Sequence, residues 1–310
     1  TPTQDEPPTF PGGKNRGPNP LDLLCASLGT CQEITYKMYS VAMGIQLYSV
    51  EAKIEGEINL NGLVGNGGPV AFTKIRGTIT VVTDATDDEL KKLKSVVDTH
   101  CPLLATLTQS VSCDLSLEHK KTDVDNSAKD PVQKDGLLAV ISAGKEDKDA
   151  LAFTYTSSSH LDGETLDSTV SLPGSHIMKV DEPHTMPGGN NKGPNPLDVF
   201  LASLGTCQEI TWKMYGTVMG IPITSVSADV QAPIDLRGLV GLDDDAVAFD
   251  KISAKITVES PADTKALEGL KAAVDTHCPV VSTIREKIDV DLKLVRGEFP
   301  ELQCGMSDSD

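Results

Sequence analysis

The chain contains the same sequence motif twice. Gly-Pro-Asn-Pro-Leu-Asp occupies Gly17–Asp22 and again Gly193–Asp198. In each copy it leads to the same nine residues, Ser-Leu-Gly-Thr-Cys-Gln-Glu-Ile-Thr, at Ser27–Thr35 and at Ser203–Thr211. Because a long repeat of this kind is the signature of a duplicated structural unit, the sequence predicts two copies of one domain.

A second repeated motif, Val-Asp-Thr-His-Cys-Pro, lies further along each copy, at Val97–Pro102 and Val274–Pro279. Each copy therefore has one cysteine inside an apolar helical pattern and a second one directly before a proline. The two predicted pairs are Cys31 with Cys101, and Cys207 with Cys278. We interpret each pair as a working dithiol.

The other cysteines do not recur. The chain has seven cysteines, too few for a secreted disulfide scaffold of this size. Cys25 corresponds to Leu201 and Cys113 to Val290, so both behave like small core residues, while Cys304 lies in the acidic C-terminal stretch. Four cysteines recur between the two copies and three do not, which predicts thiol chemistry carried out by both copies. We expect it in a soluble, reducing compartment such as the cytoplasm.

Composition excludes two classes of partner. The 310 residues carry a formal net charge of −18, which argues against binding nucleic acid through its phosphates. No apolar run reaches the roughly 18 residues that a membrane-spanning helix needs. We therefore expect neither a nucleic-acid nor a membrane partner, and the thiol chemistry calls for no bound cofactor and no metal.

The periodicity of each copy predicts an α+β fold. Asn19 and Pro20 are favourable helix-start residues, and the apolar pattern then continues to about Ala42. Alternating patterns predict a β-hairpin from two strands, followed by a second helix, a short helix opening at Cys101-Pro102 and a last strand. The expected segments are 20–42, 49–60, 70–83, 89–99, 102 onward and 111–117.

The expected domain boundaries follow from this pattern. Residues 1–118 form one domain, 119–135 a polar linker, 136–296 a second domain and 297–310 an acidic tail. The second domain carries three additional predicted strands in front of its motif: 137–142, 150–157 and 166–172. No equivalent strands precede the first motif, so the first domain is expected to lack its N-terminal strands, which lie upstream or come from another chain.

The two cysteines of a pair have different predicted environments. Cys101 and Cys278 open a short helix, where unpaired amides and the helix dipole favour the thiolate. His100 and His277 precede them and are either supporting positive charges or solvated residues before the helix. Burial inside the long helix, by contrast, raises the pKa of a thiol such as Cys31 or Cys207.

Taken together, these motifs resemble the OsmC/Ohr family, in its OsmC-like branch. The resemblance covers both halves and rests on Gly-Pro-Asn-Pro-Leu-Asp, Leu-Gly-Thr-Cys, the hairpin and Cys-Pro at these separations. It implies two OsmC-like domains that form an intramolecular pseudo-dimer, with the long cysteine helices packed between antiparallel sheets. Further self-association of the chain is left open.

The resemblance also implies an activity. Family members of this kind are thiol peroxidases that reduce organic hydroperoxides in oxidative stress defence. By resemblance, Cys31 and Cys207 match the peroxidatic cysteine, and Cys101 and Cys278 match the resolving cysteine that condenses with its sulfenic acid. The implied partners are an organic hydroperoxide and a thiol or dithiol reductant, including the lipoyl type.

The chain departs from the family at the residues that activate the peroxidatic cysteine. The peroxidases carry a glutamate ten residues before that cysteine, paired with an arginine, whereas Leu21 and Leu197 stand there in this chain. The nearest acids, Asp22 and Asp198, are interpreted as helix-start residues, with a supporting catalytic role as the alternative.

Two further hypotheses remain at this stage. The missing Glu/Arg pair favours a non-enzymatic OsmC-like protein that binds a small-molecule or lipid-like ligand, and the retained cysteine pairs favour the enzyme. A metal site built from His100, Cys101 and Cys31 is the third hypothesis, although no closely spaced ligand pair of the Cys-x-x-Cys kind accompanies it.

Overall fold

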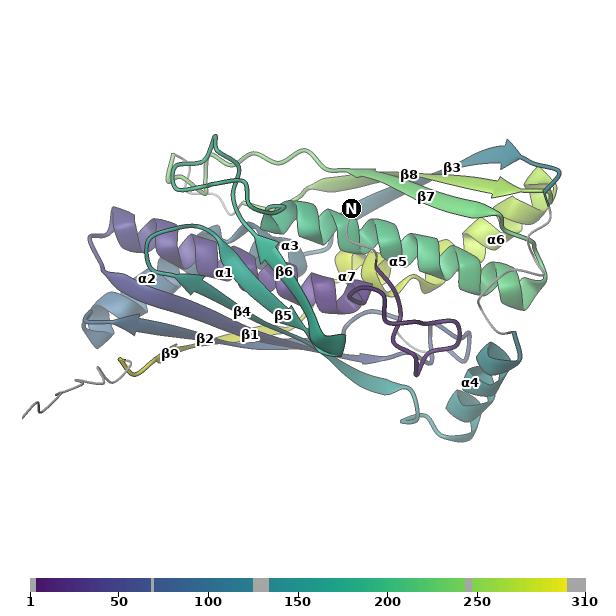
Figure 1. The fold of residues 1–310 in the computed structure, drawn as a ribbon, viewed down its shortest axis with the longest axis horizontal. Helices are drawn as coiled ribbons and strands as arrows, with labels where there is room; N and C mark the ends of the chain where they lie inside the picture. The colour runs from purple at the N-terminus through teal and green to yellow at the C-terminus, as the bar shows by residue number, and fades with distance from the viewer. Residues whose placement is uncertain (1–3, 68–69, 125–133, 243–246, 300–310) are drawn as a thin grey trace, which may run out of the picture.

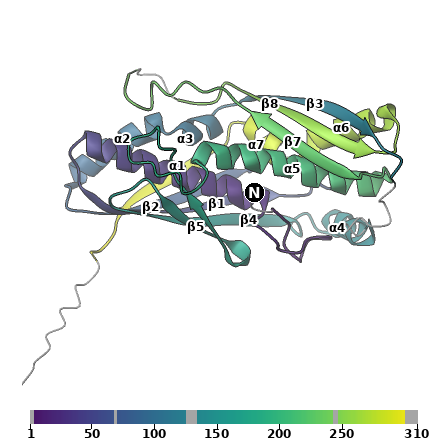
Figure 2. The same cartoon turned by 45° about the horizontal axis from the view of Figure 1, so that its top comes forward.

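A computed structural model describes residues 4–67, 70–124, 134–242 and 247–299. Its architecture is α+β, with two long helices between two sheets (Figure 1). The helix α1 (Pro20–Ala42) packs against α5 (Pro196–Met219), and each of them also packs on a sheet. Turning the molecule shows the same layers, with the helix pair in the middle (Figure 2).

The first repeat folds in the predicted order. After α1 come the strands β1 (Leu47–Asn59) and β2 (Lys74–Thr83), which pair as an antiparallel hairpin. The remaining elements are helix α2, helix α3 and strand β3, at Asp87–His100, Pro102–Leu107 and Ser112–Lys121. The strand faces predicted from alternation are buried against the helices, because in a strand every second side chain points to the same side.

The second repeat contains the same elements. Its hairpin strands are β7 (Ser225–Gln231) and β8 (Lys251–Ser260), which also pair antiparallel. Helix α6, helix α7 and strand β9 follow at Thr264–His277, Pro279–Arg285 and Val290–Arg296. Each long helix begins after an asparagine whose side chain accepts an amide hydrogen bond, Asn19 in α1 and Asn195 in α5, as the sequence predicts.

The last strand of each repeat joins the sheet of the other repeat. Strand β3 pairs in parallel with β8, and β9 pairs in parallel with β2. The sheets are therefore mixed rather than purely antiparallel. This exchange ties the two repeats together through main-chain hydrogen bonds, which no pattern within one strand reveals.

The segment between the repeats differs most from expectation. Residues 137–142, expected as a strand, lie in the helix α4 (Lys134–Glu146). The apolar residues Leu137, Leu138 and Ile141 fit a helical spacing as well as a short strand, and periodicity alone does not separate the two. The other two expected strands are present as β4 (Ala152–Asp162) and β5 (Ser168–Leu172).

A short 3-10 turn, Pro173–Ser175, and a strand that the periodicity did not predict, β6 (His176–Val180), complete this segment. Strand β4 pairs with β1, giving a six-stranded sheet in the order β6-β5-β4-β1-β2-β9. We expected these strands to complete the second repeat, and the first to lack its own. Instead they extend the sheet of the first repeat, while the sheet of the second has the order β3-β8-β7 among described residues.

The two long helices are consequently buried to different extents. Every residue of α1 from Pro20 to Tyr36 is buried, because β4 and β5 cover the side of the helix that β1 leaves open. In α5 the residues corresponding to Ala26, Thr30 and Glu33 of α1 are exposed or half-buried.

Two boundary predictions fall largely outside the described residues. In the predicted linker, β3 extends to Lys121 and α4 starts at Lys134, and residues 125–133 between them are not described. Of the predicted acidic tail, only residues 297–299 are described. The domain boundaries at 118, 136 and 296 stay predictions.

Candidate active site

The fold brings the two cysteines of each repeat into contact. The Sγ atoms of Cys31 and Cys101 are 3.3 Å apart, and those of Cys207 and Cys278 are 3.2 Å apart. All four are free thiols. Since a disulfide bond measures about 2.05 Å, each pair needs to approach by only about 1.2 Å to form one.

Local geometry explains how the second cysteine reaches the first. Cys101 ends α2 and begins α3, with an extended backbone (φ −72°, ψ 116°). Because the ring of Pro102 disfavours a helical conformation in the preceding residue, the chain turns at Cys101. Cys278 before Pro279 has the same conformation (φ −71°, ψ 117°). The turn presents the sulfur to the middle of the long helix.

The two sulfurs of a pair differ in proton affinity. Burial raises the pKa of Cys31 well above its ordinary value, and the neighbouring sulfur of Cys101 raises it further. Burial also opposes ionisation of Cys101, but hydrogen bonds from Cys31 and from the Leu104 and Leu103 amides, together with the nearby polar side chain of Gln32, lower its pKa overall. The second pair behaves alike, so Cys101 and Cys278 are the better thiolates.

Gln32 and Gln208, the residues that follow Cys31 and Cys207, belong to the site, although no sequence pattern singled them out. Both side chains are fully buried, and neither amide has a hydrogen-bond partner among the described residues. Their interactions with Cys101 and Cys278 lower the pKa of those thiols. Their position inside the repeated Cys-Gln-Glu motif was the available signal.

Replacing Gln208 with leucine should therefore raise the pKa of Cys278, because a polar amide beside the thiolate becomes an apolar group of similar size. The measurement is thiolate ultraviolet absorbance against pH in a Cys31→Ser/Cys101→Ser parent. Gln32→Leu in that parent is the matched control. Equal shifts in the two variants would contradict the assignment.

The predicted supporting residues lie further from the sulfurs. The rings of His100 and His277 stack on Tyr39 and Tyr215, with ring centroids 5.3 and 5.2 Å apart. This gives the histidines a packing role, and electrostatic support for the thiolates stays a prediction. The described residues contain no group of three or more His, Cys, Asp or Glu side chains able to hold a metal ion.

Asp22 and Asp198 have different environments. Asp22 is buried, and its carboxylate accepts a 3.0 Å hydrogen bond from the Thr156 amide of β4. Burial raises the pKa of Asp22 to about 7. Asp198, its counterpart, is exposed, because no described strand equivalent to β4 covers it. Asp22 thus anchors a strand, and a supporting catalytic role for either residue stays a prediction.

Two loop glutamates, which the sequence motifs did not single out, complete the site. Glu6 lies with Cys207 in the wall of a crevice of about 30 Å³, which Phe10, Tyr155 and Met214 also line. Glu182, which corresponds to Glu6, acts electrostatically on Cys31. Each glutamate therefore faces the cysteine of the other repeat. The repeated Asp-Glu-Pro tripeptide was the signal that could have revealed them.

The loops reach across because each packs on the other repeat's long helix. Met186 of the second loop packs in a cluster with Ile34 and Met38 of α1. Phe10 of the first loop corresponds to Met186, and it lines a hollow with Ile210 and Met214 of α5. These are the equivalent positions on the two helices, so the two loops bind in the same way.

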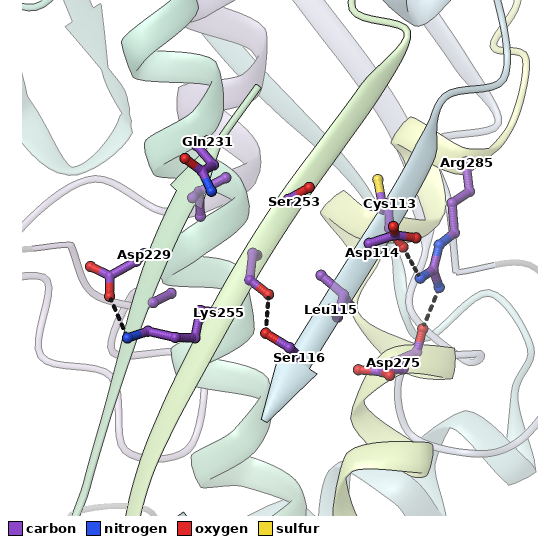
Figure 3. A pocket seen from close by; sticks show the side chains of 13 residues that line it. Cys113, Asp114, Leu115, Ser116, Asp229, Gln231, Ser253, Lys255, Asp275 and Arg285 are labelled. Atoms are coloured by element: carbon purple, nitrogen blue, oxygen red, sulfur yellow. Dashed lines mark hydrogen bonds and ion pairs between the residues drawn. The ribbon is translucent and has the colours of Figure 1, made fainter. Parts of the chain in front are cut away.

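A wider surface hollow, of about 970 Å³, lies away from the paired cysteines, over β3, β7 and β8 (Figure 3). At its edge, Arg285 donates to the backbone carbonyls of Asp275 and Cys113, at 3.0 and 2.8 Å. The guanidinium is occupied by these contacts, and the hollow contains none of the four paired cysteines.

Comparison with known proteins agrees with the repeat. A family model described as OsmC-like protein matches residues 12–116 and again residues 189–293. No curated protein matched the chain. No helix among the described residues is long and apolar enough to cross a membrane.

Solved structures that resemble the chain each correspond to less than half of it. An OsmC-like protein from Mycoplasma pneumoniae is 21% identical, with a TM-score of 0.37, over 46% of this chain and 96% of its own. An organic hydroperoxide resistance protein OsmC from Legionella pneumophila is 18% identical (TM-score 0.35; 46% and 97%). The organic hydroperoxide resistance protein OhrB of Bacillus subtilis is 20% identical (TM-score 0.32; 46% and 98%).

Proposed function

Because the chain belongs to the OsmC-like protein family, with one match in each repeat, we propose that it is a thiol-dependent peroxidase that reduces organic hydroperoxides. The observation that carries the proposal is the contact between the sulfurs of each repeated pair, 3.3 and 3.2 Å. Two reduced thiols at this distance in a buried site form a two-electron redox centre.

The attacking sulfur is that of Cys31 or Cys207. These residues keep 5% and 6% of their surface exposed, whereas Cys101 and Cys278 have none, so a peroxide reaches only the first cysteine of each pair. Because its pKa is lowered, Cys101 is the residue of the pair that is present as the thiolate. It therefore acts first as the base that takes the proton of Cys31. Cys31 then attacks as the thiolate, which is the reactive form.

The step conserves atoms and electrons. The thiolate attacks the terminal oxygen of the hydroperoxide, the O–O bond breaks, and the organic oxygen leaves with the bonding electrons and takes up a proton to give an alcohol. Cys31 is now a sulfenic acid. The Cys101 sulfur attacks it, the disulfide forms, and water leaves. A thiol or dithiol, of which a lipoyl group is one type, reduces the disulfide again.

We also propose that the two repeats act as a dimer within one chain. The exchange of β3 and β9 between the sheets supports this, as does the packing of α1 on α5. Each cysteine site is then built from both repeats, and the activity belongs to the whole chain rather than to one half. The physiological role proposed is defence against oxidative stress.

Stoichiometric oxidation tests the pairing. Two equivalents of cumene hydroperoxide should remove four thiols per chain, and peptide mapping should recover Cys31–Cys101 and Cys207–Cys278 disulfides, because each sulfur has one sulfur neighbour in contact. Thiol titration and mass spectrometry of the mapped peptides are the measurements. Cys25 and Cys113 should stay reduced as internal controls. Oxidation that leaves the four paired thiols intact would contradict the peroxidase proposal.

The non-enzymatic alternative, a binder of lipid-like ligands, has less support. Ligand sites for drug-sized molecules typically enclose about 300–1,000 Å³. The crevice beside Cys207 measures about 30 Å³, room for the end of a small molecule only.

A further inference from the structure

The proposed reaction needs a proton donor for the departing oxygen, and the position of the activating glutamate in the related peroxidases holds Leu21 and Leu197 here. We propose that Glu6 and Glu182 are that donor, each as a catalytic acid for the cysteine of the other repeat: Glu6 for Cys207 and Glu182 for Cys31. This inference rests on the peroxidase function proposed above.

Position is the first argument for Glu6. Glu6 lines the same narrow crevice as Cys207, and a peroxide that reaches the sulfur through this crevice passes Glu6. The rest of the wall is largely apolar, with Phe10, Leu60 and Met214 among its residues. A hydroperoxide that places its terminal oxygen at the sulfur therefore has Glu6 beside it as an acid.

The carboxyl is also held in place. The side-chain amide of Asn19 donates a 2.6 Å hydrogen bond to Oε2 of Glu6, and Asn19 itself is fixed as the residue that caps α1. Orientation of this kind keeps one oxygen occupied and leaves the other for the substrate. Because the acid is already ordered, less conformational entropy is lost when it donates its proton in the reaction.

The groups around Glu6 favour its protonated form at neutral pH. Burial, with smaller contributions from the carboxylates of Asp22 and Asp5, raises the pKa of Glu6 to about 7 despite the hydrogen bond from Asn19. Tyr155 and Cys207, the other titratable groups in the crevice wall, have raised pKa values, so both are neutral before the reaction begins. Arg16 and Lys213 line the neighbouring hollow together with Glu6. Arg16 is paired with Asp5 at 3.1 Å, and Lys213 donates to the backbone carbonyl of Ile223 at 3.0 Å.

Glu182 has the matching environment in the second loop. Burial, together with the charges of Asp181 and Asp198, raises its pKa to about 7. An acid with a pKa near the working pH combines protonation with ready proton release, which suits general acid catalysis. The step balances: thiolate, hydroperoxide and carboxylic acid give sulfenic acid, alcohol and carboxylate, and the glutamate regains its proton from solvent.

The test isolates one site in the full chain. A Cys31→Ser parent retains only the Cys207 site. Glu6→Gln in this parent should slow cumene hydroperoxide consumption by at least about a hundredfold, the lower end of the usual range for a lost general acid. The rate at which iodoacetamide alkylates Cys207 should change by less than about threefold, because iodide leaves without a proton. The rate of the reaction with peracetic acid should also change little, because acetate leaves readily without being protonated. Asp88→Asn, at an exposed site on α2, is the control.

The pH profile gives a second readout. The parent's rate should decline as pH rises through about 7, because the acid loses its proton, and Glu6→Gln should lack that decline. Equal losses with hydroperoxide, peracid and iodoacetamide would mean that Glu6 only supports packing, and no loss would mean that it is not the acid. Either result overturns the inference, as does a larger effect of Glu182→Gln than of Glu6→Gln in this parent. A parent that consumes no peroxide while Cys207 still alkylates would instead refute the proposed function itself.

Discussion

Replacing Cys31 and Cys207 together with serine is expected to reduce hydroperoxide consumption to below about 1% of the wild-type rate, because a serine hydroxyl does not ionise near neutral pH as a thiol does. Each single variant should keep about half of the activity, since the two sites have the same sulfur geometry. The measurement is loss of cumene or tert-butyl hydroperoxide with dithiothreitol or dihydrolipoamide as reductant.

Matched cysteine variants separate chemistry from stability. Cys113→Ser removes a buried cysteine that lies in no pair and should leave turnover close to wild type. Cys101→Ser with Cys278→Ser should slow the first attack, because the base that takes the proton of the attacking cysteine is removed, and should block disulfide formation. The sulfenic acid should then accumulate and be trapped by dimedone. Full turnover in the Cys31→Ser/Cys207→Ser variant would refute the peroxidase proposal.

The largest expected effect on stability concerns Glu33, a fully buried glutamate in α1. Its carboxyl accepts hydrogen bonds from the hydroxyls of Ser168 and Ser159, at 2.6 and 2.8 Å, and from the amide of Ala52 at 3.0 Å. Burial raises the pKa of Glu33 to about 8 despite these bonds.

The sign of the pH dependence follows from this shift. Below the unfolded pKa of about 4.5 both states hold the proton, and between about 4.5 and 8 only the folded state does, so unfolding releases a proton there. The free energy of unfolding therefore falls as pH rises across this range. Glu33→Gln removes the titration, and we expect it to flatten the curve by about 2–4 kcal/mol between pH 5 and pH 8.5.

Urea unfolding at several pH values measures this effect, and the second repeat provides the control. Glu209 corresponds to Glu33, but it is half-buried, and its carboxylate accepts from the Ala228 amide at 3.1 Å. Burial raises its pKa as well. Because the remaining surface is solvated, Glu209→Gln should change the slope by much less. An unchanged slope in Glu33→Gln would show that the carboxyl ionises freely in the folded state.

The sequence by itself determined the local structure of each repeat. Helix starts at Asn19 and Asn195, the hairpin patterns and the Cys-Pro turn follow from short-range rules, and the structure contains all of them. The repeat also indicated which cysteines belong together, because Cys31, Cys101, Cys207 and Cys278 recur and Cys25 and Cys113 do not. The strand expected at 137–142 failed because a short apolar run satisfies helix and strand periods alike.

Tertiary structure decided which segments meet. Strands β4 to β6 join the sheet of the first repeat, and β3 and β9 cross to the opposite sheets, because strand pairing depends on edges that lie far apart in sequence. Packing of the first loop on α5 brings Glu6 into the crevice of Cys207. Strands β4 and β5 leave Glu33 fully buried, while Glu209 keeps contact with solvent. Identical motifs thus acquire different burial and different partners, since proton affinity and packing depend on neighbours that only the folded chain supplies.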